Sequence, residues 1–561
     1  MREASTRQRV FVLGLDGATF TLLKPWAAVG KLPNFKRVLD GGAHGILKST
    51  LPPLTPPGWT SAITGVNPGK HNIYSFFKPM RRAYRRRVYN ARDIKAPKLW
   101  EILGASGKRS IILHLPLTYP VDPLNGLMVA GMMTPVGAAH YTYPRELADE
   151  LRRVIADYRL NVDTTYARAG RLNTLLKECL EVTDIHCRET LYLMERKPWD
   201  LFFAMLHTPD LVMHMFWKFM EPRHPFYPGP NEFQDAILQC YRRVDVLLGE
   251  ILERLDESSH LLILSDHGFE MTRKNVFITN WLVHSGYLVL RRARRLAFKR
   301  ALFKAGIQRE RLVKHLEAWR LAWVPKLFPE SIKNQVPRSR PSFQNIEDHI
   351  DWTRTRAYFP SAGGSAIYLN VKGREPLGIV HPDGEYAALR DEIIERLGEL
   401  KDPETGRPVI GAIHKREDVY WGEYLDHAPD IMLLPASGYF LNEGLGDEVI
   451  SRAGGGKVER SGNHHMDGVV MLYGPCVRSG VEIQGARIID VTPTILYLLG
   501  LPVPDYMDGR VLTEALVPDY IERVPVTYTA ARFEASTTSG FEYTEEERMS
   551  LEERLKDLGY M

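Results

Sequence analysis

The chain has 561 residues, of which 44% are hydrophobic and 25% charged, and its formal net charge is +5. This length exceeds what one hydrophobic core normally supports, so we expect a large domain with insertions or two domains. The balance of apolar and charged residues is typical of a soluble globular protein and excludes long disordered stretches.

The amino terminus is polar, and no apolar stretch reaches the roughly 18 residues that a membrane span requires. The four cysteines include no C-x-x-C pair, which indicates free thiols and argues against a disulfide framework or a thiolate zinc site. We therefore expect a cytoplasmic protein, with peripheral contact at a membrane surface as the alternative location.

Strands and helices alternate along the first half of the chain. The first 70 residues predict a strand, a helix, a second strand and a Pro-rich turn that enters a helix at about Gly58. Such alternation favours an α/β fold with a mostly parallel sheet covered on both faces. Further helices are predicted over 99–103, 144–156, 171–195 and 232–256, and further strands over 110–115, 201–206 and 261–265.

The chain changes character over residues 286–345, which are basic and predicted to be helical. Positions 291–340 hold fifteen Lys or Arg against three Glu. The alternatives for this segment are a lid, a membrane-surface helix and a nucleic-acid patch, whereas its Leu and Trp stripe favours core packing. A mixed α+β pattern follows over 351–435, then a strand over 469–473 and a helix over 491–499. We divide the chain into a first core part (1–285), a basic helical insertion (286–345), a mixed segment that returns to the core (346–517) and a tail with a helix (518–561).

Three apolar runs each end close to an aspartate, at Asp16, Asp210 and Asp266. The carboxyl ends of parallel strands meet at one edge of a sheet, so these carboxylates are predicted to converge there. His267 follows Asp266 directly, and His214 lies one helical turn beyond Asp210. Oxygen and nitrogen ligands of this kind are typical of a metal site, and the pattern predicts a two-metal hydrolase.

Thr55 lies in a Pro-rich turn just before a predicted helix. The free amides and the dipole of a helix amino terminus favour an anion, so amides next to Thr55 are expected to receive phosphate charge. A hydroxyl is a poor nucleophile unless a metal or a base activates it. The alternative for Thr55 is an ordinary helix cap.

Several motifs occur together in the order found in one family. The chain resembles the type I phosphodiesterase/nucleotide pyrophosphatase branch of the alkaline phosphatase superfamily, most closely its phosphohydrolase/phosphomutase group, over about residues 9–515. The motifs are Gly14-Leu15-Asp16-Gly17, the Thr55-x-Pro57 turn leading to Thr64-Gly65 and His71, Pro209-Asp210-x-x-x-His214, Asp266-His267-Gly268, and Gly462-x-His464 before Gly474-Pro475.

The resemblance implies a ligand set for each of two divalent ions. One ion would be held by Asp16, Thr55, Asp266 and His267, and the other by Asp210, His214 and His464. His464 rests on the family pattern alone, and its neighbour His465 competes with it. Zinc is favoured for this mixture of ligands, with manganese as the alternative. The implied fold is an alkaline-phosphatase-like three-layer sandwich with an inserted basic helical lid or cap.

The chain departs from the family pattern in one place. Nucleotide pyrophosphatases carry a phosphate-binding Asn about twenty residues after the nucleophile, where this chain has Ile73-Tyr74-Ser75-Phe76-Phe77. This difference argues against nucleotide hydrolysis. An arginine-rich stretch over 81–87 follows, and Arg85, Arg86 and Arg87 are candidate substrate-binding residues, with a solvated loop as the alternative.

The expected activity is hydrolysis of phosphate esters, diesters in particular, through a phospho-threonine at Thr55. The second interpretation is a phosphotransferase or phosphomutase at the same site, and the third is a non-catalytic protein that binds polyanions or lipids. The expected partner is an anionic phosphate ester, with lipid head-group contact through the basic segment as an option and no nucleic acid. The oligomeric state stays open.

Overall fold

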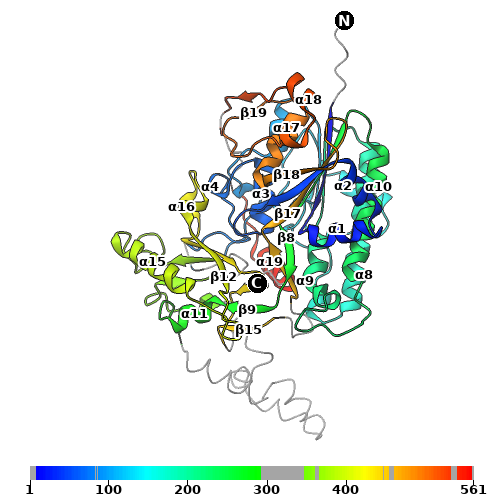
Figure 1. Ribbon diagram of the computed structural model, residues 1–561. Helices are drawn as coiled ribbons and strands as arrows, with labels where there is room; N and C mark the ends of the chain where they lie inside the picture. The colour runs from blue at the N-terminus through cyan, green and yellow to red at the C-terminus, as the bar shows by residue number, and fades with distance from the viewer. Residues whose placement is uncertain are drawn as a thin grey trace.

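The computed structural model describes residues 8–81, 84, 86–291, 346–360, 365–445, 448–453, 460–531, 533 and 540–558. Within these residues the largest feature is a nine-stranded sheet between two layers of helices (Figure 1). Its strand order is β18-β2-β17-β7-β1-β6-β3-β4-β5. The strands are β1 (Arg9–Leu15), β2 (Ala43–Lys48), β3 (Ser110–Leu113), β4 (Gly126–Val129), β5 (Thr142–Tyr143), β6 (Leu201–Leu206), β7 (Ser259–Leu264), β17 (Asp467–Tyr473) and β18 (Val481–Arg487).

The centre of the sheet is parallel, as the alternation of strands and helices predicts. Strand β1 pairs in parallel with β6 on one side and β7 on the other, and β3 pairs in parallel with β6 and β4. Strand β17 is antiparallel to both β7 and β2. The four neighbouring strands β7, β1, β6 and β3 therefore end at a common edge, which we call the carboxyl edge.

Alternate residues of β1 enter two separate hydrophobic cores, which gives the three-layer sandwich. Phe11 and Leu13 belong to one core, and Val10 and Val12 to the other. The first core is covered by α1 (Phe20–Ala28), α2 (Pro33–Gly41), α6 (Leu147–Val154), α7 (Thr165–Arg168), α8 (Leu172–Arg196), α9 (Thr208–Met220), α10 (Ala236–Arg254) and α19 (Glu545–Asp557). The second is covered by α3 (Thr55–Thr64), α5 (Leu99–Ala105), α17 (Val491–Leu498) and α18 (Pro518–Arg523).

Helix α3 begins at Thr55, three residues before the predicted start at Gly58. Pro56 and Pro57 occupy the first turn, where a missing N–H group costs no hydrogen bond. The helix lies close to β1, because a Cβ atom on Gly14 would come within 2.6 Å of the Trp59 ring. Gly14 therefore lets the helix that carries Thr55 approach the strand that leads to Asp16.

A smaller α+β unit with its own core is inserted between β8 (Gly268–Met271) and β16 (Gly462–His465), two strands that pair antiparallel (Figure 1). We call it the cap unit, and its four-stranded sheet has the order β10-β11-β13-β12. Its elements are β9 (Lys274–Phe277), α11 (Ile278–His284), β10 (Ala357–Tyr358), β11 (Ala366–Leu369), α15 (Gly384–Gly398), β12 (Ile410–Lys415), α16 (Arg416–Val419), β13 (Ile431–Pro435), β14 (Tyr439–Asn442) and β15 (Ile450–Arg452). Residues 292–345, most of the predicted basic helical insertion, lie outside the described residues.

The chain returns to the main core after the cap unit. A short parallel pair, β19 (Val503–Pro504) and β20 (Tyr528–Thr529), precedes α19, the helix predicted for the tail. Leu551 and Leu555 of α19 are buried in the first core, and the Arg460 guanidinium donates hydrogen bonds to the Leu558 carbonyl. None of the described helices combines the length and the apolar character that a bilayer span requires.

Candidate metal centre

Strand register places three of the functional side chains at the carboxyl edge. Leu15 of β1 is in register with Leu206 of β6, and Gly14 with Leu264 of β7. The residues just past these strand ends are Asp16, His207 and Asp266, so they lie on neighbouring strands. Asp16 and Asp266 are buried, and His207 is half-buried. The convergence predicted for Asp16 and Asp266 is therefore present in the fold.

A first group of ligands surrounds the Nε2 atom of His267. This atom lies 3.2 Å from Asp266 Oδ2, 3.5 Å from Asp16 Oδ1 and 3.4 Å from Thr55 Oγ1. His267 Nδ1 lies 3.1 Å from the Gly268 carbonyl oxygen, which can only accept, so Nδ1 carries the proton. The Nε2 lone pair therefore points at carboxylate oxygens.

A second group is formed by Asp210 and His214 on α9 and by His464 on β16. The Nε2 atoms of the two histidines are 3.0 Å apart, and Asp210 Oδ1 lies 3.3 Å from one and 3.2 Å from the other. Each histidine donates its Nδ1–H to a backbone carbonyl at 2.9 Å, of Gly462 for His214 and of Pro53 for His464. Two imidazole lone pairs and a carboxylate oxygen thus face one another.

Such an arrangement is repulsive unless a cation lies between the three atoms. In a tetrahedral site with bonds of about 2.0 Å to nitrogen and oxygen, ligand atoms are separated by about 3.3 Å. The separations of 3.0 to 3.5 Å in the two groups match that geometry. A backbone carbonyl that fixes the far ring nitrogen is also the usual support for a metal-binding histidine. The two groups therefore fit divalent ions.

The two groups lie side by side. The rings of His267 and His464 stack with their centroids 3.7 Å apart, and ligand atoms of Asp210, His267 and His464 all lie within 4.8 Å of one another. Two ions in these positions would be close enough to act on the same phosphate. The geometry thus brings together Asp16, Thr55, Asp210, His214, Asp266, His267 and His464, the seven ligands implied by the family resemblance.

The electrostatics of the buried side chains also favour cations. Burial and the nearby charge of Asp210 raise the pKa of Asp16, and burial and Asp16 raise the pKa of Asp266. Burial lowers the pKa of His214 to about 3 and keeps the imidazole neutral. Bound divalent ions stabilise deprotonated carboxylates and neutral imidazoles, which are the forms that coordinate a metal.

His464, and not its neighbour His465, contributes a ligand atom to the second group. Successive residues of a strand point to opposite faces, so only one of the two can reach Asp210. The ring of His465 instead accepts a hydrogen bond from the Asp467 amide at 3.2 Å. The structure therefore places His465 away from the ligands.

His207 is a site residue to which the sequence analysis gave no role. Its Nδ1 atom lies 2.6 Å from Asp16 Oδ2, the carboxylate oxygen that does not face His267. Burial lowers the pKa of His207 to about 4, so the ring is a neutral donor that orients Asp16. Its place immediately after β6, the strand next to β1, is the signal that could have identified it.

Thr55 is fully buried as the first residue of α3. The prediction that neighbouring amides receive phosphate charge is wrong for the first turn, because Pro56 and Pro57 have no N–H group and the Gly58 amide donates to the Leu54 carbonyl at 2.9 Å. Positions 56 to 58 therefore offer no free N–H group to a phosphate bound at Thr55. The Thr55 hydroxyl lies beside His267.

The arginines of segment 81–87 have different surroundings. Arg86 forms a buried ion pair with Glu347 at 2.7 Å, and the more exposed Arg87 pairs with Glu542 at 3.0 Å. Arg85 lies outside the described residues. Arg81 is partly buried, and its Nε and Nη2 atoms are buried without a hydrogen-bond partner. Among the described arginines of this segment, Arg81 is the one whose guanidinium offers buried, unsatisfied donors.

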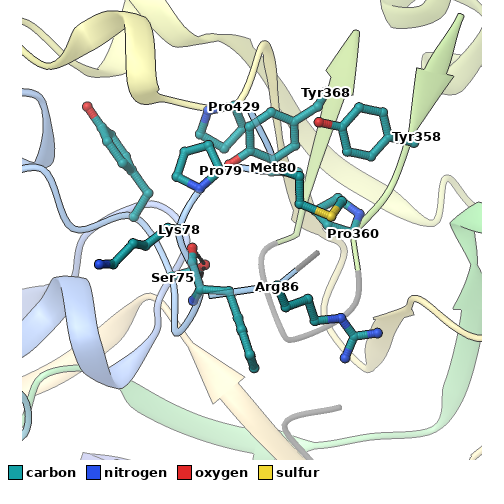
Figure 2. Close-up of a pocket in the computed structure, with 12 residues that line it drawn as sticks. Ser75, Lys78, Pro79, Met80, Arg86, Tyr358, Pro360, Tyr368 and Pro429 are labelled. Carbon is teal, nitrogen blue, oxygen red and sulfur yellow. Dashed lines mark hydrogen bonds between the residues drawn. The ribbon is translucent and has the colours of Figure 1, made fainter. Parts of the chain in front are cut away.

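A cavity lies between this segment and the cap unit (Figure 2). Ser75, Lys78, Pro79, Met80 and Arg86 line it from one side, and Tyr358 and Tyr368 face them from β10 and β11. The charge of Arg81 acts on Tyr74 and Tyr368, which both line the cavity, and helps to limit the rise of their pKa values caused by burial. Aromatic and proline side chains thus line the cavity together with the cationic side chains of Lys78 and Arg86, and Arg81 acts on its tyrosines by charge.

Comparisons with known proteins relate the chain to a family of phosphodiesterases. A model of the family described as Type I phosphodiesterase / nucleotide pyrophosphatase matches residues 10–467. A 2,3-bisphosphoglycerate-independent phosphoglycerate mutase of Cereibacter sphaeroides (strain ATCC 17025 / ATH 2.4.3) is 28% identical over 143 residues, which span 21% of this chain and 28% of the mutase.

Two solved structures were matched to the chain. Phosphonoacetate hydrolase from Sinorhizobium meliloti 1021, in complex with phosphonoformate, superimposes with a TM-score of 0.51 at 13% identity, over 88% of this chain and 95% of that chain. Murine ectonucleotide pyrophosphatase / phosphodiesterase 5 in complex with AMP gives a TM-score of 0.48 at 13% identity, over 91% and 100%. At this level of identity the hydrolase match shows a shared fold.

Proposed function

The chain belongs to the type I phosphodiesterase / nucleotide pyrophosphatase family, and from this premise we propose that it hydrolyses phosphate esters, diesters in particular, at a two-metal site. The observation that carries the proposal is the approach of three acceptor atoms, with the Nε2 atoms of His214 and His464 3.0 Å apart and 3.3 and 3.2 Å from Asp210 Oδ1. That arrangement is stable only around a cation. The ligand mixture favours Zn²⁺, with Mn²⁺ as the alternative.

In this proposal Thr55 is the nucleophile. Its Oγ1 atom forms a bond to phosphorus while the bond from phosphorus to the leaving alcohol breaks, which gives a phospho-threonine. Attack by water then breaks the bond between phosphorus and Oγ1 and regenerates the hydroxyl. The rigid first turn of α3 holds the hydroxyl next to His267, and His207 holds Asp16 in place through its hydrogen bond.

The metal ions would be held by two sets of residues. Asp16, Thr55, Asp266 and His267 form one set, and Asp210, His214 and His464 form the other. Bound divalent ions would supply Lewis-acid stabilisation of negative charge on the attacking and leaving oxygens. The proline-containing turn supports this assignment, because it removes the amides that would otherwise take up that charge.

We assign the non-reacting part of the substrate to the aromatic cavity of Figure 2. Tyrosine and proline side chains suit an organic group, and the unsatisfied guanidinium nitrogens of Arg81 suit an additional anion such as a second phosphate or a carboxylate. Arg86 and Arg87 are already neutralised by Glu347 and Glu542. Although Arg86 lines the cavity, these ion pairs support Arg81 ahead of Arg86 and Arg87 as the anion-binding residue among the described arginines of this segment.

A phosphotransferase or phosphomutase is the second candidate, and the match to a phosphoglycerate mutase favours it specifically. The first half-reaction is the same for both candidates. The difference lies in the acceptor, which is water in a hydrolase and a second alcohol group in a transferase. Product analysis in the presence of an added alcohol separates the two.

The test is a screen of phosphomonoesters, phosphodiesters and sulfate esters with the protein loaded with Zn²⁺ or Mn²⁺. We expect diesters to turn over fastest, chelation to remove the activity and mass spectrometry of quenched reactions to find the modified peptide at Thr55. Full activity after exhaustive chelation would rule out the metal mechanism. Transfer to the added alcohol in place of water would favour the second candidate.

A further inference from the structure

A second group of metal-binding side chains continues along the carboxyl edge. His114 follows β3, the strand that pairs with β6, whose end carries His207. His186 and Glu189 lie on α8 with the i, i+3 spacing that places both on one face of a helix. All three side chains are buried, with residue exposures of 4% for each histidine and 0% for the glutamate. None of them belongs to the two ligand sets described above.

The three side chains contact one another. His114 Nε2 lies 2.6 Å from Glu189 Oε2, and the Tyr158 hydroxyl donates to Glu189 Oε1 at 3.1 Å. The His114 and His186 rings stack with their centroids 3.8 Å apart. One ligand atom from each of the three residues lies within 4.8 Å of the others.

The ring nitrogens of this cluster are poorly satisfied. His114 Nδ1 and both ring nitrogens of His186 are buried without a hydrogen bond, although the carbonyl groups of Arg159 and Leu160 lie near the His186 ring. Burial of polar atoms without partners is unfavourable, so a ligand that occupies the free ring nitrogens of this pair would stabilise it. His114 also has a φ of 61°, a backbone conformation that is uncommon for residues other than glycine. Strain of this kind is typical of functional positions.

We propose that His114, His186 and Glu189 bind an additional divalent transition metal such as Zn²⁺, separate from the two-metal site. Two imidazoles and one carboxylate are an established set of three zinc ligands, and a fourth position remains for water. The stacked rings direct their lone pairs into nearly parallel planes, so one ring must rotate to share the ion. His186 is the ring that rotates, because His114 is held by its 2.6 Å contact with Glu189, whereas His186 has only the nearby Arg159 and Leu160 carbonyls.

The metal content of the full-length protein tests this proposal. The protein is saturated with Zn²⁺, freed of excess metal by gel filtration and analysed by mass spectrometry of the elements. We expect three ions per chain in the unmodified protein and two in His186→Leu. Asp210→Asn removes an ion from the two-metal site, so the double variant is expected to retain one. The matched control is His224→Leu, which replaces a buried histidine that also has an unsatisfied ring nitrogen but belongs to none of the ligand groups.

The ion counts of these variants distinguish the additional site from the two-metal site of the proposed function. Loss of an ion in Asp210→Asn, together with an unchanged ion count in His186→Leu, would overturn the additional site and leave the two-metal site intact. The reverse result would support the additional site while removing support for the two-metal site. If His186→Leu does not fold, Glu189→Gln serves in its place, because it keeps the side-chain shape and removes the charge. Equal ion counts in Glu189→Gln and the unmodified protein would then overturn the proposal.

Discussion

The carboxyl edge and the arginine-rich segment 81–87 hold their charged side chains in different ways. At the edge, Asp16 and His207 are neighbours because β1 and β6 are in register, and no other contact is needed to bring them together. In the segment, Arg86 is positioned by Glu347, which lies 261 residues further along the chain. Side chains at strand ends are thus arranged by the backbone, whereas the arginines are arranged by distant partners. A role assigned from local sequence is therefore more reliable for side chains at strand ends than for these arginines.

The sharpest test of the edge is Thr55→Ala. We expect loss of turnover by roughly four orders of magnitude or more, because the nucleophile is removed, with metal content nearly unchanged. Steady-state kinetics and metal analysis measure both. Thr55→Ser retains the hydroxyl and should recover part of the rate. Near-normal turnover of the alanine variant would move the nucleophile elsewhere, with Thr60 the first residue to examine.

Replacing one metal ligand tests whether the ligands at the carboxyl edge bind metal together. His214→Ala should remove one ion and reduce kcat/KM by roughly two to three orders of magnitude, because a metal contributes several kcal/mol to charge stabilisation. His224→Ala is the control and should leave both quantities unchanged. If His214→Ala keeps its full metal content and rate, His214 is not a ligand.

In the arginine segment, Arg86→Ala should act on stability. Removing Arg86 takes the opposite charge of a buried ion pair away from Glu347, and we expect a loss of about 3 to 5 kcal/mol in the free energy of unfolding. Arg87→Ala, in an exposed pair, should cost at most about 1 kcal/mol. Denaturant titrations of both variants measure the difference. Equal losses would show that burial does not separate the two pairs.

A smaller effect is expected when the support of Asp16 is changed. His207→Ala removes the hydrogen bond at 2.6 Å and should weaken metal binding by roughly 10- to 100-fold, the usual effect of losing a group that orients a ligand. Competition with a chelator of known affinity measures the change. His207→Gln keeps a side-chain N–H donor and should recover part of the affinity, and no recovery would count against an orienting role.

The smallest effect is expected for the variant that tests substrate binding by the arginine segment. Arg81→Ala should raise KM roughly tenfold for a diester that carries an additional anion and leave a small neutral-tailed diester unchanged. The difference should decrease at high salt if Arg81 is reached by solvent. Arg87→Ala is the matched control. Equal losses on both substrates would indicate that Arg81 supports folding and does not recognise substrate.

The parts of the fold that the sequence predicted well are those with a local signal. The β-rich runs that end near Asp16 and Asp266 and the alternation with helices predicted a parallel sheet and its functional edge. The start of α3 was misplaced, because prolines read as the end of a turn also fit the first turn of a helix.

The parts that could not be predicted depend on pairing between distant segments. His464, which the family resemblance alone indicated, reaches the site because β16 pairs antiparallel with β8, and no local pattern specifies that pairing. The cap unit that separates these strands could be recognised only as a mixed region. The neutralisation of Arg86 and Arg87 likewise requires Glu347 and Glu542, whose positions follow from tertiary structure.

The pairing of β8 with β16 also affects how the protein forms. His214 and His464 are 250 residues apart, so His214 is synthesised well before its partner. Closing a loop of this length costs about 5 kcal/mol of chain entropy, and the main sheet is incomplete until β17 and β18 have been added. The second ligand group can therefore assemble only late in folding, after the cap unit has been translated. Metal uptake by a growing chain would mark the moment at which the cap unit has closed.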